Sequence, residues 1–240
     1  INIRRFMMKK IGIIKEFRTD DNRTPLTPKH IKKLISKFSN IKIIVQPSKH
    51  RCFSNQEYEN EGAILHESLN ECDLILGVKE IEPNLLIPNK SYMFFSHTSK
   101  IQQDHSAAAQ GTPGMDKKKL IREILNKKIT LIDYENIRDN LSRRYLGFGR
   151  FAGIVGCYNS LNLYLTTIGQ NPMPRAYEVD TYENLKDNIA NRDFENARII
   201  ITGDGRVARG SLEFLEFTNI KKILPDEYLK NKYSSAVFAI

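Results

Sequence analysis

Short apolar runs alternate with helical segments along the first half of the chain. Runs of strand length occupy residues 9–16, 41–47, 72–80, 91–97 and 129–135. Between several of them apolar residues recur at helical spacing, as in "TPKHIKKLISKF", "NQEYENEGAIL" and "KKLIREILNKK". In the first of these segments Thr27 is placed to act as an N-cap and Pro28 to occupy the first helical turn. This order predicts an α/β fold with a parallel sheet and helices on its faces.

A different pattern follows residue 150. The segment "FAGIVGCYNSLNLYLTTIG" (151–169) is apolar on two faces, as expected of a long helix buried between two layers or two domains. Further on, "RIIITGDGRVARGSLEFLE" (198–216) predicts a buried strand, a glycine turn and a helix. The turn has the G-x-G-x-x-A form through Gly203, Gly205 and Ala208. That form is typical of dinucleotide-binding units.

The glycine turn suggests how a nucleotide would be held. Gly203 permits a tight turn, Gly205 lets the backbone approach a pyrophosphate, and the helix from about Arg206 presents unpaired N–H groups to the anion. Asp226 follows the next apolar segment and is the candidate for the ribose hydroxyls, with Glu227 beside it as the alternative; an acid there favours NAD over NADP. The alternative is a glycine turn with a structural role only.

These patterns predict two domains. We expect an N-terminal Rossmann-like substrate and catalytic domain at 8–150, and a buried helix with an interdomain connection at 151–196. The segment 197–240 is then the beginning of an NAD-binding Rossmann domain. Because Ile240 follows the glycine turn closely, we expect that domain to be incomplete in this chain.

Composition narrows the choice of partners and compartment. The formal charge is +9 and the pI about 9.4, but the lysines are dispersed without interleaved aromatic residues, so we expect no nucleic-acid partner. The three cysteines show no CxxC spacing and no histidine at ligand spacing, which indicates free thiols and no metal site. No apolar run or leader pattern predicts a membrane segment or signal peptide. The expected location is the cytoplasm.

Polar side chains follow two of the apolar runs. His97 ends "YMFFSH", and Lys79 ends a neighbouring run beside Glu80. Ligands of parallel sheets bind where such strands end, and histidine moves protons near neutral pH. Each residue also has a structural explanation, since Lys79 with Glu80 could be a surface pair. Arg23 could clamp a carboxylate or cap a loop.

Six motifs together carry a family resemblance. They are "IGIIKEFRTDDNRTPLTPKHIKKL", "GVKEI", "FFSHT", "TLIDYE", "RRYLGFGRFAGIVG" and "IIITGDGRVARG". The first resembles the opening of the alanine dehydrogenase and transhydrogenase N-terminal family. The others together resemble its branch containing saccharopine dehydrogenase (NAD, L-lysine-forming) and lysine:2-oxoglutarate reductase. The resemblance covers roughly residues 9–240.

The resemblance implies an oxidoreductase acting on the CH–NH group of amino acids. It would interconvert saccharopine with lysine and 2-oxoglutarate, with NAD as cofactor. Lys79 and His97 match the family's acid/base pair, and Arg23 matches its substrate-carboxylate arginine. The other matched positions are the pKa-tuning Glu80 and Glu135, the saccharopine-contacting Gln102 and Phe148, and the cofactor-side Arg144.

Two alternatives stay open. One is an amino-acid dehydrogenase of the alanine dehydrogenase type, which would use pyruvate and ammonia. The other is a catalytically inactive fragment or binding module. The sequence indicates neither the direction of the reaction nor the oligomeric state.

Overall fold

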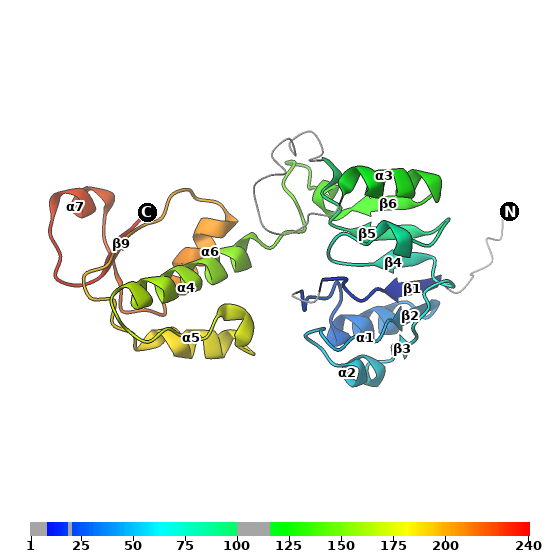
Figure 1. Cartoon of the computed structure of the whole chain (residues 1–240), viewed down its shortest axis with the longest axis horizontal. Coiled ribbons are helices and arrows are strands. Elements are labelled where there is room, and N and C mark those ends of the chain that lie inside the picture. The colour runs from blue at the N-terminus through cyan, green and yellow to red at the C-terminus, as the bar shows by residue number, and fades with distance from the viewer. Residues whose placement is uncertain (1–8, 19–20, 100–115) are drawn as a thin grey trace. The chain divides into compact units, whose positions relative to one another are not determined.

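The computed structural model describes residues 9–18, 21–99 and 116–240. The chain forms two compact units, residues 1–146 and residues 147–240, shown in Figure 1. The predicted α/β fold is confirmed, because each unit contains a parallel sheet with helices.

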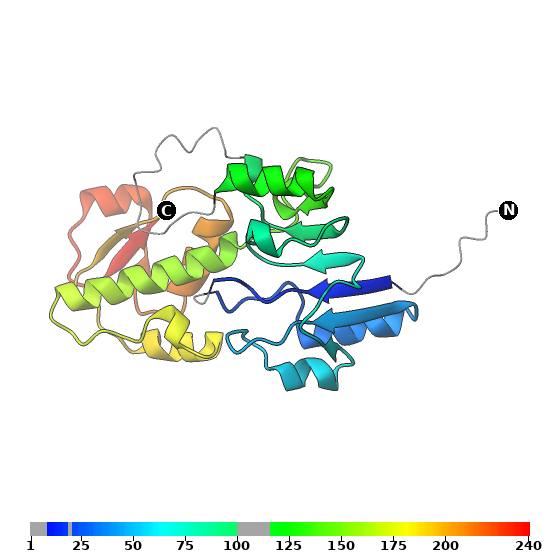
Figure 2. The same cartoon turned by 45° about the vertical axis from the view of Figure 1, so that its right-hand side comes forward.

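The described part of the first unit contains a six-stranded parallel sheet with the order β3-β2-β1-β4-β5-β6. Its strands are β1 (Lys9–Ile13), β2 (Ile41–Val45), β3 (Ile64–Leu65), β4 (Leu74–Leu76), β5 (Ser91–Phe94) and β6 (Thr130–Asp133). In Figure 2 the blue arrow of β1 and the cyan arrow of β4 point the same way. The predicted run 72–80 is mostly loop, so Lys79 and Glu80 lie beyond the end of β4.

Three α-helices of the first unit are described: α1 (Pro28–Lys37), α2 (Asn55–Asn60) and α3 (Lys117–Asn126). The expected cap of α1 is present, since the Thr27 side chain accepts a hydrogen bond from the backbone N–H of His30. A capping box formed by Ser54 and Glu57 likewise starts α2.

Successive side chains along each strand point to opposite faces of the sheet, so the buried residues form one cluster on each face. Ile43 and Val45 belong to a buried cluster with Ile31 of α1 and Tyr58 of α2. Ile44, between them in β2, belongs to the opposite cluster. That second cluster also contains Ile75, Tyr92, Phe94, Leu120 and Ile124. Both faces are therefore covered, as parallel sheets require.

The second unit has its own core and its own sheet. Its helices are α4 (Gly149–Thr167), α5 (Tyr182–Ala190), α6 (Arg206–Leu215) and α7 (Pro225–Lys230). Its strands are β7 (Arg198–Ile200), β8 (Lys221–Lys222) and β9 (Val237–Ala239), all parallel, in the order β7-β9-β8. Tyr158, Leu165, Ile189 and Phe214 are fully buried in its main cluster.

Helices α4 and α6 approach each other very closely. A Cβ atom placed on Gly153 of α4 would lie 2.0 Å from the Val207 carbonyl oxygen. A Cβ atom on Gly210 of α6 would lie 2.0 Å from the Arg150 carbonyl oxygen. The hydroxyl of Ser211 donates to the Gly153 carbonyl at 3.1 Å across the same contact. Only glycine at both crossing positions permits this backbone-to-backbone packing.

Candidate functional site

The strand order of the first unit places a topological switch point between β1 and β4. From β1 the chain runs outward through β2 and β3, and then returns to the other side of β1 with β4, β5 and β6. The loops after adjacent strands diverge at such a point, so ligands of doubly wound sheets bind outside the strand ends there. The predicted acid/base residues follow β4 and β5 at this edge.

His97 and Glu80 form a close pair at this edge. His97 Nδ1 lies 2.6 Å from Glu80 Oε1, and both side chains are about four-fifths buried, with 20% and 18% exposed. Burial alone would raise the pKa of Glu80, but the hydrogen bond from His97 holds that pKa below its usual range. Because the ionised carboxylate only accepts, His97 Nδ1 donates the hydrogen bond. This bond orients the ring and leaves Nε2 for another partner.

The backbone of His97 is in an unusual conformation. Its φ is +51°, in the left-handed region that non-glycine residues seldom adopt. Phe95 stacks near the ring at a centroid separation of 6.4 Å. The buried side chain of Ser96 bonds to Asp133 and, at 2.8 Å, to Thr98, so the residues on both sides of His97 are held. A strained conformation fixed by its neighbours is typical of a functional position.

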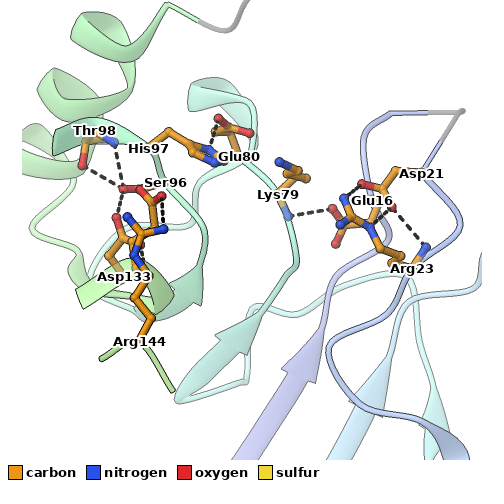
Figure 3. Close-up of polar contacts among 11 residues, drawn as sticks. Glu16, Asp21, Arg23, Lys79, Glu80, Ser96, His97, Thr98, Asp133 and Arg144 are labelled. Carbon is orange, nitrogen blue, oxygen red and sulfur yellow. Dashed lines mark hydrogen bonds and ion pairs between the residues drawn. The ribbon is translucent and has the colours of Figure 1, made fainter. Parts of the chain in front are cut away.

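Glu16 joins the loops across the switch point. Its two carboxylate oxygens accept the backbone N–H groups of Val78 at 2.7 Å and Lys79 at 3.0 Å. Burial raises the pKa of Glu16, against the effect of these two hydrogen bonds. Figure 3 shows Lys79 between this carboxylate and the Glu80–His97 pair. Sequence reasoning missed Glu16, although its position at the end of the predicted run 9–16 was an available signal.

Arg23 is already engaged by a neighbouring carboxylate. Its Nε donates to Asp21 Oδ1 at 2.8 Å and its Nη2 to Asp21 Oδ2. Burial alone would raise the pKa of Asp21, but the guanidinium of Arg23 lowers it below its usual range. Asp21 therefore bonds the Nε and Nη2 atoms of the predicted carboxylate clamp.

Glu135 and Arg144 form a second polar group in the first unit. Glu135 Oε1 lies 3.3 Å from Arg144 Nη1. The backbone N–H of Glu135 donates to Asp133 Oδ1 at 2.8 Å. Glu135 is buried, whereas Arg144 is partly exposed. The structure therefore brings Lys79, Glu80 and His97 together, and pairs Glu135 with Arg144. Gln102 lies outside the described residues.

The remaining predicted site residues belong to the second unit. Phe148 is the residue before α4 and is 41% exposed. Gly203 has a φ of +90°, and Gly205 is the N-cap of α6. No described heavy atom lies within 4 Å of a Cβ position built on either glycine, and no side chain caps α6 at Gly205. Arg206 begins α6. An open glycine turn before an uncapped ten-residue helix fits a bound phosphate.

Asp226 lies away from this turn. It belongs to the first turn of α7, which follows β8, and β9 separates β8 from β7. With about 4.8 Å between neighbouring strands, β8 is two strand spacings from β7. A role for Asp226 on a ribose stays a prediction.

Comparison with known proteins decides the family. Residues 12–155 match the model described as the alanine dehydrogenase/PNT N-terminal domain. The chain belongs to this family. It is therefore a member of an oxidoreductase family, as the motifs predicted.

Two curated relatives carry the same name, alpha-aminoadipic semialdehyde synthase. The mitochondrial protein of Bos taurus is 32% identical in an alignment 228 residues long that covers 88% of this chain and 22% of the relative. The Arabidopsis thaliana protein is 35% identical in an alignment 161 residues long that covers 65% of this chain and 14% of the relative. This member of the alanine dehydrogenase/PNT family therefore spans less than a quarter of the length of these relatives.

A solved structure, an L-alanine dehydrogenase, has the same fold. It matches with a TM-score of 0.61 at 15% identity, over 96% of this chain and 60% of that one. No helix within the described ranges has the length and apolar content needed to cross a bilayer. One relative named above is mitochondrial, and a cytoplasmic location for this family member stays a prediction.

Proposed function

We propose that this chain provides the substrate-side acid/base site for the NAD-dependent interconversion of saccharopine with lysine and 2-oxoglutarate. The observation that carries the proposal is the grouping of Lys79 with the Glu80–His97 pair at the topological switch point. The sequence identity of 32% and 35% to two alpha-aminoadipic semialdehyde synthases supports the saccharopine branch.

The reaction needs protons moved at two different steps. In the oxidative direction the secondary amine of saccharopine loses a proton from nitrogen, and the neighbouring carbon would lose a hydride to NAD. The imine left by these two losses then gains water before lysine and 2-oxoglutarate separate. Lys79 Nζ and His97 Nε2 are the groups at the site suited to take or give these protons. The Glu80 hydrogen bond keeps Nε2 as the reacting nitrogen of His97 and stabilises the imidazolium when it forms.

The cofactor would be held by the glycine turn of the second unit. The open space at Gly203 and Gly205 fits the phosphates, and Arg206 adds positive charge at the start of α6. NAD, when bound, accepts the hydride from the carbon next to the nitrogen. We propose that Arg144 contacts the cofactor and that Phe148 contacts the substrate.

The second candidate function is that of an amino-acid dehydrogenase of the alanine dehydrogenase type. The family match to alanine dehydrogenase/PNT favours it as much as it favours the saccharopine reaction. The two differ in substrate: alanine carries one carboxylate, whereas saccharopine carries three.

Ligand-dependent stability distinguishes the two. We expect saccharopine, but not alanine, to raise the thermal midpoint of the chain, because a ligand that binds only the folded state stabilises it by mass action. At about 100 times its Kd the stabilisation is about 2.7 kcal/mol. Differential scanning fluorimetry with each amino acid at matched concentration measures this. A shift with alanine and none with saccharopine would overturn the proposal.

A further inference from the structure

Arg51 is a half-buried guanidinium in the loop after β2, at the same edge of the sheet as the site. Its Nη2 donates to the carbonyl of Gln46 at 3.0 Å. Its guanidinium carbon lies 5.2 Å from the ring centroid of Tyr58, which is fully buried. The guanidinium itself is thus packed against the buried Tyr58 ring.

Two hydrogen bonds place this loop beside the site. The backbone N–H of Cys52 donates to the carbonyl of Asn22 at 2.8 Å, which ties Arg51 to the loop that carries Arg23. The backbone N–H of Lys15 donates to Gln46 Oε1 at 3.1 Å, next to Glu16. The carboxylate of Glu16 in turn holds the backbone of Lys79. Arg51 therefore neighbours both the Arg23 loop and the Glu16 contact to Lys79.

Among the described residues the charge of Arg51 has no direct counter-ion. Its Nη1 is buried without a hydrogen-bond acceptor, and no carboxylate of the described residues lies within ion-pairing distance of it. Burial lowers the pKa of its guanidinium, while the negative charge of Glu16 acts on it only at longer range. Arg23, by contrast, is bonded through two nitrogens to Asp21. A buried cation with an unused donor costs free energy that an anionic ligand would recover.

We propose that Arg51 binds a carboxylate of the substrate and, with Arg23, selects a dicarboxylic 2-oxo acid over a monocarboxylic one. This inference rests on the proposed function, in which 2-oxoglutarate is the oxo acid. Two guanidinium groups on neighbouring loops match its two carboxylates, whereas pyruvate has one. Arg51 is thus a specificity-determining residue: a rotation of its guanidinium would exchange the Nη2 bond to the Gln46 carbonyl for a substrate carboxylate and bring Nη1, which has no hydrogen-bond partner among the described residues, to the same carboxylate.

The test compares oxo-acid binding by variants of the whole chain. Arg51→Met keeps an apolar side chain near Tyr58 and removes the guanidinium. Arg51→Lys keeps the charge without the two-pronged guanidinium. Arg122→Met, which removes an exposed arginine of α3, is the control. Isothermal titration calorimetry gives the Kd for 2-oxoglutarate and for pyruvate, and circular dichroism confirms folding. We expect Arg51→Met to weaken 2-oxoglutarate binding ~10–100-fold. Pyruvate binding and Arg122→Met should change little.

The outcomes separate this inference from the proposed function. Equal 2-oxoglutarate binding by wild type and a folded Arg51→Met, or no binding by wild type, overturns the inference. If Arg51→Met does not fold, Arg51→Lys is the deciding variant. We expect its affinity for 2-oxoglutarate to fall ~10-fold, and an unchanged Kd would contradict the inference. The proposed function fails separately, if saccharopine does not stabilise the chain while 2-oxoglutarate still binds through Arg51.

Discussion

Lys79→Met and His97→Gln are each expected to lower the turnover of lysine- and 2-oxoglutarate-dependent NADH oxidation ~10²–10⁴-fold, the range supplied by one positioned acid or base. The folded stability should change little, because Lys79 is partly exposed and the amide of a glutamine at position 97 can still donate to Glu80. Steady-state kinetics of the chain and its variants, with unfolding followed by circular dichroism, measures both quantities.

Two exposed residues provide matched controls for these substitutions. Lys33→Met on α1 and His66→Gln after β3, an outer strand of the sheet, make the same chemical changes away from the Glu80–His97 pair. They should keep wild-type turnover. If the Lys79 and His97 variants turned over as fast as these controls, the two side chains would not be the acid and base.

Gly153→Ala is expected to destabilise the second unit by about 3 kcal/mol, at the upper end of the usual cost of overpacking. The added methyl would lie 2.0 Å from the Val207 carbonyl oxygen and 2.8 Å from the Ser211 nitrogen, and both are backbone atoms that cannot rotate away. The helices would have to separate, which would disturb the core around Tyr158 and Phe214. Urea unfolding followed by circular dichroism measures the loss.

Gly156→Ala in the same helix is the matched control. No heavy atom of another described element lies within 4 Å of its Cβ position, so the methyl meets open space there. Replacing a mid-helix glycine by alanine should then stabilise the unit by about 0.5–1 kcal/mol. Opposite signs for the two substitutions are the signature of the close α4–α6 contact. A Gly153→Ala chain as stable as Gly156→Ala would contradict that contact.

The elements that the sequence predicted well are those with local signals. Thr27 and Pro28 mark the start of α1, and apolar spacing located α3 and α4 to within a few residues. Strand lengths were less accurate, since β4 spans only Leu74–Leu76 of the predicted run 72–80. Apolar residues continue past the strand because they are buried under neighbouring loops, and periodicity does not separate these two kinds of burial. The two-residue strand β3 was not predicted.

The candidate site could be predicted only in part, because its geometry comes from contacts distant in sequence. The position of His97 and Lys79 after strands was readable, but the bond between His97 and Glu80 was not. Glu16 acts on Lys79 from 63 residues away, and the Asp21 partner of Arg23 gives no pattern that distinguishes it from a loop acid. The insertion of β9 between β7 and β8 depends on pairing at the end of the chain. No local signal in "IKKILPDEYL" indicates it.

The most direct test of the central claim is NADH oxidation by the 240-residue chain with lysine and 2-oxoglutarate together, and with each omitted. A site with the saccharopine-type acid/base pair predicts oxidation that requires both substrates and is lost in His97→Gln. Oxidation supported by pyruvate and ammonia instead, with none from lysine and 2-oxoglutarate, would contradict it.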